Sequence, residues 1–255
     1  FAYSEFSYNT LVGAYEPFLD IICNMHRRFI GGSFDDFQKE CGVYYLHRQV
    51  LNSYYETGEC FREETVLLNE VAYEQRRMTM AIADMLKKLS EVKPLMIVIN
   101  RFQMASKSSI ETIKYLIDNP CANIGIVLGV NAIVKGTDST VEVWDRIVES
   151  LEDRSAIYYI GSAGPLKNNV KTTNDDELYI TMNFEQSIQE ASNIMEFLDF
   201  EQARRGCRII EHKLKFEDAW IDEKSLRRFY MVYARTSVLL GETVSYTHLT
   251  LPTIA

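Results

Sequence analysis

Residues 94–109, PLMIVINRFQMASKSS, are the segment that indicates the fold most clearly. Five apolar residues follow one another at 95–99, and the chain then becomes polar at 100–101. A short apolar run without alternation is typical of a strand that a parallel sheet buries on both faces. Ser108, with Glu111 three residues later, forms a capping box. The stretch therefore predicts a buried strand that leads into a helix.

The flanking sequence repeats this alternation of strands and helices. Upstream, the pattern predicts a short strand over 1–8 and a long helix over 63–91. Downstream, it predicts strands over 124–130 and 156–160 with a helix over 140–151 between them. Strands and helices that alternate at this spacing form parallel sheets with right-handed crossovers. The sequence thus predicts an α/β fold.

From residue 184 onward the sequence predicts helices alone. One helix runs from 184 to about residue 215, and Gly206 could interrupt it. A second helix runs over 222–240. We therefore divide the chain into an α/β domain over 1–183 and a helical unit over 184–243. The helical unit could begin a tetratricopeptide-like repeat array.

The last residues, 244–255, do not read as part of the natural protein. The run at 244–253, VSYTHLTLPT, corresponds in one reading frame to the translated end of a transposon-library sequencing adapter. We expect this segment to be such an adapter and exclude it from the fold. The chain begins with Phe1 rather than Met, so we expect the natural polypeptide to continue at both ends.

The net charge of the chain argues against partners that are themselves strongly negative. The chain has 27 Lys and Arg against 36 Asp and Glu, a formal net charge of −9. General nucleic-acid binders and proteins that bind anionic membranes need a basic surface, so we expect neither partner. The sequence also lacks the ~18 consecutive apolar residues that a membrane-spanning helix needs.

Five cysteines lie far apart in the sequence, which indicates reduced thiols in a cytoplasmic protein. A metal ion could in principle use Cys23, His26, Cys41 and His47, but their spacing fits no common zinc pattern. We therefore expect no metal site.

Residues 94–109 resemble the Walker B region of signal-transduction ATPases with numerous domains, a class of P-loop NTPases. In that class an apolar strand ends in two acids. A hydrophobic residue, Gln or His, Trp, Ala and Asp follow, and small hydroxyl residues then start a helix. Met104 takes the place of Trp. The positions that fit are Gln103, Ala105, Ser108 and Ser109.

The resemblance extends over about residues 1–165 and implies a three-layer P-loop-type sheet. It implies that residues 124–131 are the sensor-1 strand, with Asn131 as the polar sensor. It also implies that the strand bearing the phosphate-binding loop lies between the strands at 124–130 and 156–160. The motif of that loop, G-x-x-x-x-G-K-[ST], does not occur in these residues, so the resemblance places it upstream of Phe1.

The two acids of the Walker B region are also replaced, by Asn100 and Arg101. An amide supports magnesium poorly, and a guanidinium cannot act as a base. Loss of a general base commonly lowers the rate by ~10²–10⁴-fold. We therefore expect no hydrolysis from this chain, and ATP with magnesium only in the full-length protein.

These features predict a degenerate nucleotide-binding regulatory module of a bacterial multidomain signalling protein. Its expected partners are the missing phosphate-loop strand, downstream helical and output domains, and other proteins. A catalytically inactive interaction scaffold and an unrelated α/β enzyme fragment stay open as alternatives, because a buried strand and a following helix occur in many folds. Asn131 could equally be a turn residue after a strand.

Overall fold

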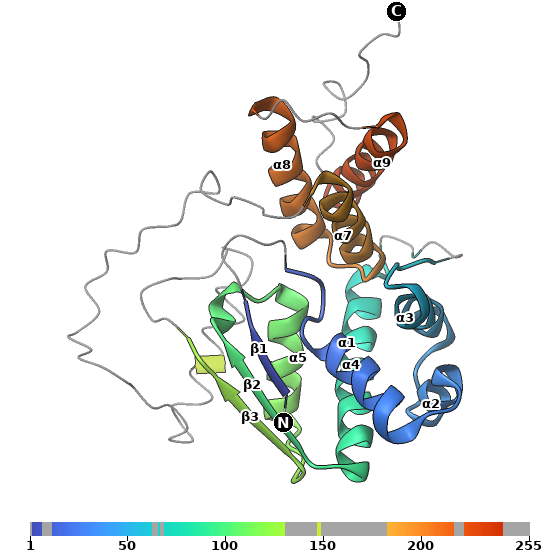
Figure 1. The fold of residues 1–255 in the computed structure, drawn as a ribbon, viewed down its shortest axis with the longest axis vertical. Helices are drawn as coiled ribbons and strands as arrows, with labels where there is room; N and C mark the ends of the chain where they lie inside the picture. Colours follow the sequence, from blue (N-terminus) through green and yellow to red (C-terminus); the bar gives the residue numbers. More distant parts are fainter. Residues whose placement is uncertain are drawn as a thin grey trace, which may run out of the picture.

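The computed structural model describes residues 2–6, 12–62, 66, 69–130, 147–148, 183–216 and 222–241. Strands β1 (Ala2–Glu5), β2 (Leu95–Asn100) and β3 (Ile124–Leu128) form a parallel sheet in the order β1-β2-β3 (Figure 1). The parallel α/β fold expected from the sequence is therefore confirmed. The predicted helix over 140–151 and strand over 156–160 lie outside the described residues, apart from 147–148, which are helical.

Strand β2 buries one face only, so the expectation of burial on both faces was wrong. Leu95, Ile97 and Ile99 are buried, whereas Met96 on the other face is 44% exposed. Tyr3 and Val127 lie on that same face by the strand register and are 58% and 52% exposed. We call the face formed by Tyr3, Met96 and Val127 the open face. Leu95, Ile97 and Ile99 on the opposite face belong to the same core cluster as the buried residues of the helices Val71–Val92 and Lys107–Asp118, and this difference between the two faces produces the alternating burial along β2.

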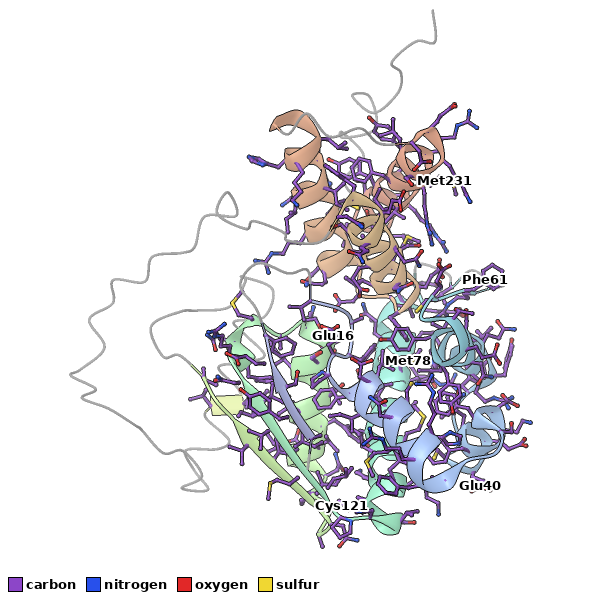
Figure 2. All side chains as sticks on the ribbon, viewed as in Figure 1. Glu16, Glu40, Phe61, Met78, Cys121 and Met231 are labelled. Atoms are coloured by element: carbon purple, nitrogen blue, oxygen red, sulfur yellow. The ribbon has the colours of Figure 1, made fainter. Side chains whose placement is uncertain are left out.

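The helices before β2 are α1 (Phe18–Met25), the π-helical turn η1 (His26–Ile30), α2 (Phe34–Glu40), α3 (Tyr45–Thr57) and α4 (Val71–Val92). Helix α4 forms the centre of the core, as Figure 2 shows for Met78. Its fully buried apolar side chains are Met78, Ile82, Ala83, Met85, Leu86 and Leu89. The helix begins later than the prediction over 63–91, because residues 69–70 form a turn and Glu70 provides no side-chain cap.

A short 3-10 turn, η2 (Phe102–Met104), connects β2 to helix α5 (Lys107–Asp118). Ser106 caps α5, because its side chain accepts a hydrogen bond from the Ser109 N–H. The predicted capping box of Ser108 and Glu111 was therefore wrong. The Ser108 hydroxyl has a different partner, which lies in the C-terminal unit.

The C-terminal unit consists of three helices, α7 (Phe184–Glu196), α8 (Phe200–Phe216) and α9 (Glu223–Leu239), packed against one another. The prediction of one helix over 184–215 was wrong, since the chain turns at 197–199 and not at Gly206. Leu198 adopts a left-handed conformation at this turn, with φ of 67°. We call residues 197–199 the corner. Helix α9 agrees with the prediction, and Asp222 caps it through the Lys224 and Ser225 N–H groups.

Candidate functional site at the carboxyl end of the sheet

Asn100 lies at the carboxyl end of β2, directly beside Glu5 at the end of β1. The Asn100 Nδ2 donates to Glu5 Oε1 at 3.4 Å, and the Asn100 Oδ1 accepts from the Arg101 N–H at 3.0 Å. The structure thus brings Asn100 to the edge where ligands of open parallel sheets bind. It adds a carboxylate that the sequence analysis did not identify.

Arg101 pairs with the same carboxylate. Its Nη2 lies 3.3 Å from Glu5 Oε1, and both side chains are about two-fifths exposed, at 42% and 38%. Arg101 has a left-handed backbone, with φ of 56°, which turns the chain sharply at the end of β2. The cluster of Glu5, Asn100 and Arg101 therefore contains one acid, one amide and one cation. A divalent ion would have to compete with Arg101 for the one carboxylate.

Gly129, just beyond β3, completes the cluster on its other side. The Gly129 N–H donates to the Ile99 carbonyl at 2.7 Å, and the Phe102 N–H donates to the Gly129 carbonyl at 2.9 Å. A Cβ atom at Gly129 would lie only 2.7 Å from Asn100 Oδ1. A larger residue at this position would displace the Asn100 amide. Asn131, the predicted sensor residue, lies outside the described residues.

The outer edge of β3 has no strand partner within the described residues. Gly129 bonds to β2, and successive residues of a strand alternate in direction, so the N–H and C=O groups of Ile126 and Leu128 point away from β2. Ile124, Ile126 and Leu128 are only partly buried. Strand β3 is therefore an edge strand of the described sheet.

A buried carboxylate of the C-terminal unit, Asp199, forms hydrogen bonds with the first turn of α5. The Asp199 Oδ2 accepts from the Ser108 hydroxyl at 2.9 Å and from the Ser108 N–H at 3.4 Å. The Asp199 Oδ1 accepts from the Gln202 N–H at 3.4 Å. Burial raises the pKa of Asp199, whereas its hydrogen bonds to Ser108 oppose that shift. A negative charge beside the N-terminus of a helix is favourable, so Asp199 acts as an additional cap of α5.

Further contacts hold the corner against the α/β unit. The Gln75 amide donates to the Leu198 carbonyl, and Ser108, which bonds to Asp199 of the corner, accepts from the Tyr15 N–H at 3.1 Å. The Tyr15 and Phe197 rings pack edge to face with their centroids 5.8 Å apart. The helical unit is thus joined to the segment that directly follows the Glu5–Asn100–Arg101 cluster. No local sequence signal identifies Asp199, because its partner lies 91 residues away.

Two acidic side chains crowd together where α7 meets the α/β unit, and Figure 2 labels one of them, Glu16. The Gly13 N–H donates to Glu16 Oε2 at 3.1 Å, and a Cβ at Gly13 would lie 2.7 Å from Glu190 Oε1. Burial, followed by the charges of Glu16 and Asp20, raises the pKa of the Glu190 carboxyl to about 7. Burial likewise raises the pKa of Glu16. The junction therefore favours protonated carboxyl groups.

Comparison with protein-family models, with curated proteins and with solved structures gave no match to this chain. Among the described residues, no group of three or more His, Cys, Asp and Glu side chains is arranged to hold a metal ion. No described helix is long and apolar enough to cross a membrane. The geometry at the carboxyl end of the sheet is therefore the basis for the function proposed below.

Proposed function

We propose that the chain is a degenerate nucleotide-binding regulatory module of a larger signalling protein, and that it binds nucleotide without hydrolysing it. The observation that carries this proposal is the cluster at the end of β2. The resemblance assigns Asn100 and Arg101 to positions where a hydrolytic site of this kind needs acids, and the carboxylate that contacts both of them, Glu5, is paired with Arg101. Metal-assisted hydrolysis needs carboxylates that hold Mg²⁺ and orient water.

The open face and the outer edge of β3 support the idea that a further strand and helix complete the module. The chain advances from β1 to β2 to β3 in one direction across the sheet, with its connecting helices on one face. Suppose that a further strand lies beside β3 and that a helix connects this strand to β1. That connection crosses the sheet in the opposite direction to the connections from β1 to β2 and from β2 to β3. A right-handed crossover then places that helix on the open face. Such a unit would cover Tyr3, Met96 and Val127, and it would be the third layer of the sheet.

The nucleotide phosphates would bind where the new strand ends, beside Gly129 and Asn100. Phosphate groups favour glycine-rich loops and helix N-termini, which the completing strand and helix would supply. The contact between Asp199 and Ser108 would then connect this site to the three-helix unit. A change at the end of β2 could thereby alter the packing of the helices, as a regulatory module requires.

The test uses the longest polypeptide that the reading frame encodes, and it measures ATP affinity by calorimetry with and without Mg²⁺. We expect binding whose affinity changes by less than about threefold with Mg²⁺, because Glu5, the one acid of the described cluster, is paired with Arg101. In Asn100→Asp, the restored acid should make the affinity clearly dependent on Mg²⁺. The matched control is Asn119→Asp, the same change at the exposed C-terminal end of α5, which should behave like the unmodified protein.

An inactive interaction scaffold is the second candidate. The specific observation in its favour is that Glu5, Asn100 and Arg101 bond to one another, which reduces the polar capacity available to a ligand. Absence of ATP binding at millimolar concentration in the full polypeptide would favour the scaffold and contradict the nucleotide proposal.

A further inference from the structure

A cavity of about 110 Å³ lies where the three-helix unit meets the α/β unit, away from the Glu5–Asn100–Arg101 cluster. Its charged wall consists of Arg62 from the segment after α3, Glu196 at the end of α7, and Arg235 on α9. The rest of the wall is apolar and includes Leu198, Phe200 and Leu239. The cavity thus has a charged side and an apolar side.

The charged side carries an excess of positive charge. Arg62 is only 9% exposed, and its Nη2 donates to the Glu196 carbonyl at 3.0 Å. The Nε and Nη1 atoms of Arg62 are buried and have no hydrogen-bond partner within the described part of the chain. The Glu196 carboxylate forms an ion pair with Arg235, whose Nη1 lies 2.9 Å from Glu196 Oε1. Among the described residues that line the cavity, two guanidinium groups therefore lie beside one carboxylate.

An anion in the cavity would stabilise this arrangement of charges. Burial lowers the pKa of Arg62, which shows that desolvation opposes its charge, although Glu196 and Glu74 act the other way. A buried charge without full compensation costs several kcal/mol, and an additional negative group in the cavity would offset that cost. Arginine is well suited to this role because its planar group matches a carboxylate.

The apolar side decides which anion fits best. A phosphate ion presents oxygen atoms in all directions, and those that faced Phe200 and Leu239 would lose hydrogen bonds to water. A monocarboxylate presents two oxygens to the arginines and its hydrocarbon part to the apolar wall. Protein cavities of about 150 Å³ hold benzene, so this cavity suits roughly four or five non-hydrogen atoms.

We propose that this cavity binds a short-chain carboxylate of the size of acetate or propionate. The ligand contacts Arg62 of the α/β unit and α9 of the helical unit at once, so it stabilises the docking of the two units. Because it binds only when the units are packed together, its binding raises the unfolding temperature. This site is independent of the proposed nucleotide site.

The experiment measures the thermal unfolding of the chain at pH 7 and constant ionic strength in chloride, phosphate, acetate, propionate and neutral propionamide. We expect acetate or propionate to raise the unfolding temperature by about 2 °C or more over chloride. Propionamide should match chloride, and phosphate, which stabilises folded proteins in general, should raise the unfolding temperature by less than the carboxylates do. An equal rise in phosphate would indicate general screening of charge and would overturn the proposal, as would the absence of any carboxylate-specific rise.

Two variants make the test specific to the cavity. Leu239→Phe fills the space and leaves all three charges, so it should fold and lose the carboxylate response. Arg235→Gln removes one cation of the wall and should weaken carboxylate binding at least fivefold, measured by the NMR shift of ¹³C-labelled acetate. The matched control is Arg227→Gln, which also removes an arginine paired with a glutamate on α9 and should not change the response. A full response in Leu239→Phe would contradict the assignment.

Discussion

Asp199→Ala should lower the free energy of unfolding by about 2–4 kcal/mol. The substitution removes the acceptor of the buried Ser108 N–H and of the part-buried Gln202 N–H, and it leaves Ser106 Oγ, 3.0 Å away, as the acceptor for the Ser108 hydroxyl. Hydrogen bonds to a charged group contribute about 1.5–3 kcal/mol, and buried donors without a partner add a desolvation cost. Chemical denaturation at pH 7, followed by circular dichroism, measures the change.

The control for this prediction keeps the shape of the side chain. Asp199→Asn retains one carbonyl acceptor for the Ser108 hydroxyl, so it should lose only about 1 kcal/mol. The double variant of Asp199→Ala with Ser108→Ala should be less destabilised than the sum of the two single variants, because the two residues share one interaction. Additive effects would show that the Asp199–Ser108 contact does not join the units.

Glu190→Gln should stabilise the protein at pH 8 by about 2–3 kcal/mol and have little effect at pH 5. The folded protein holds the Glu190 pKa at about 7, above its ordinary value of 4.5. The folded state therefore binds a proton that the unfolded state releases between these two pH values. The stability is fully present below pH 4.5 and is lost as the pH rises through 7, at about 1.4 kcal/mol per pH unit. Glutamine removes this loss because it stays neutral.

The measurement is the free energy of unfolding of both proteins at pH 5, 6, 7 and 8. Glu185→Gln is the matched control, since Glu185 is exposed in the first turn of the same helix and should leave the pH dependence unchanged. The negative charges of Glu16 and Asp20 oppose the ionisation of Glu190. They therefore raise the Glu190 pKa in the same direction as burial does. The expectation would be contradicted if the free energies of unfolding of Glu190→Gln and the unmodified protein differed by the same amount at every pH.

The strands could be predicted from the sequence, but the exposure of their faces could not. The apolar run at 95–99 identified β2 correctly, because such a run has a strong strand preference in either environment. Met96 and Val98 suit a buried and an open face equally well, so the run did not reveal that one face lacks a described helix. The start of α4 and the corner were missed for a related reason. Apolar periodicity marks the inner face of a helix better than its ends.

The candidate site could be predicted only in part. Asn100 and Arg101 were identified because the polar end of a buried strand is visible in the sequence. Glu5 was missed because its position beside Asn100 depends on the register of two strands 95 residues apart. Asp199 was missed because nothing in its own segment indicates a partner on α5.

The most direct test of the central claim is steady-state ATP hydrolysis by the longest polypeptide that the reading frame encodes, measured with Mg²⁺ in excess. The claim is that the end of β2 lacks the unpaired acids that metal-assisted hydrolysis requires. It predicts turnover at least about 10²-fold below the ~1–10³ s⁻¹ that is ordinary for enzymes. Turnover within that ordinary range, abolished by removal of Mg²⁺, would contradict it.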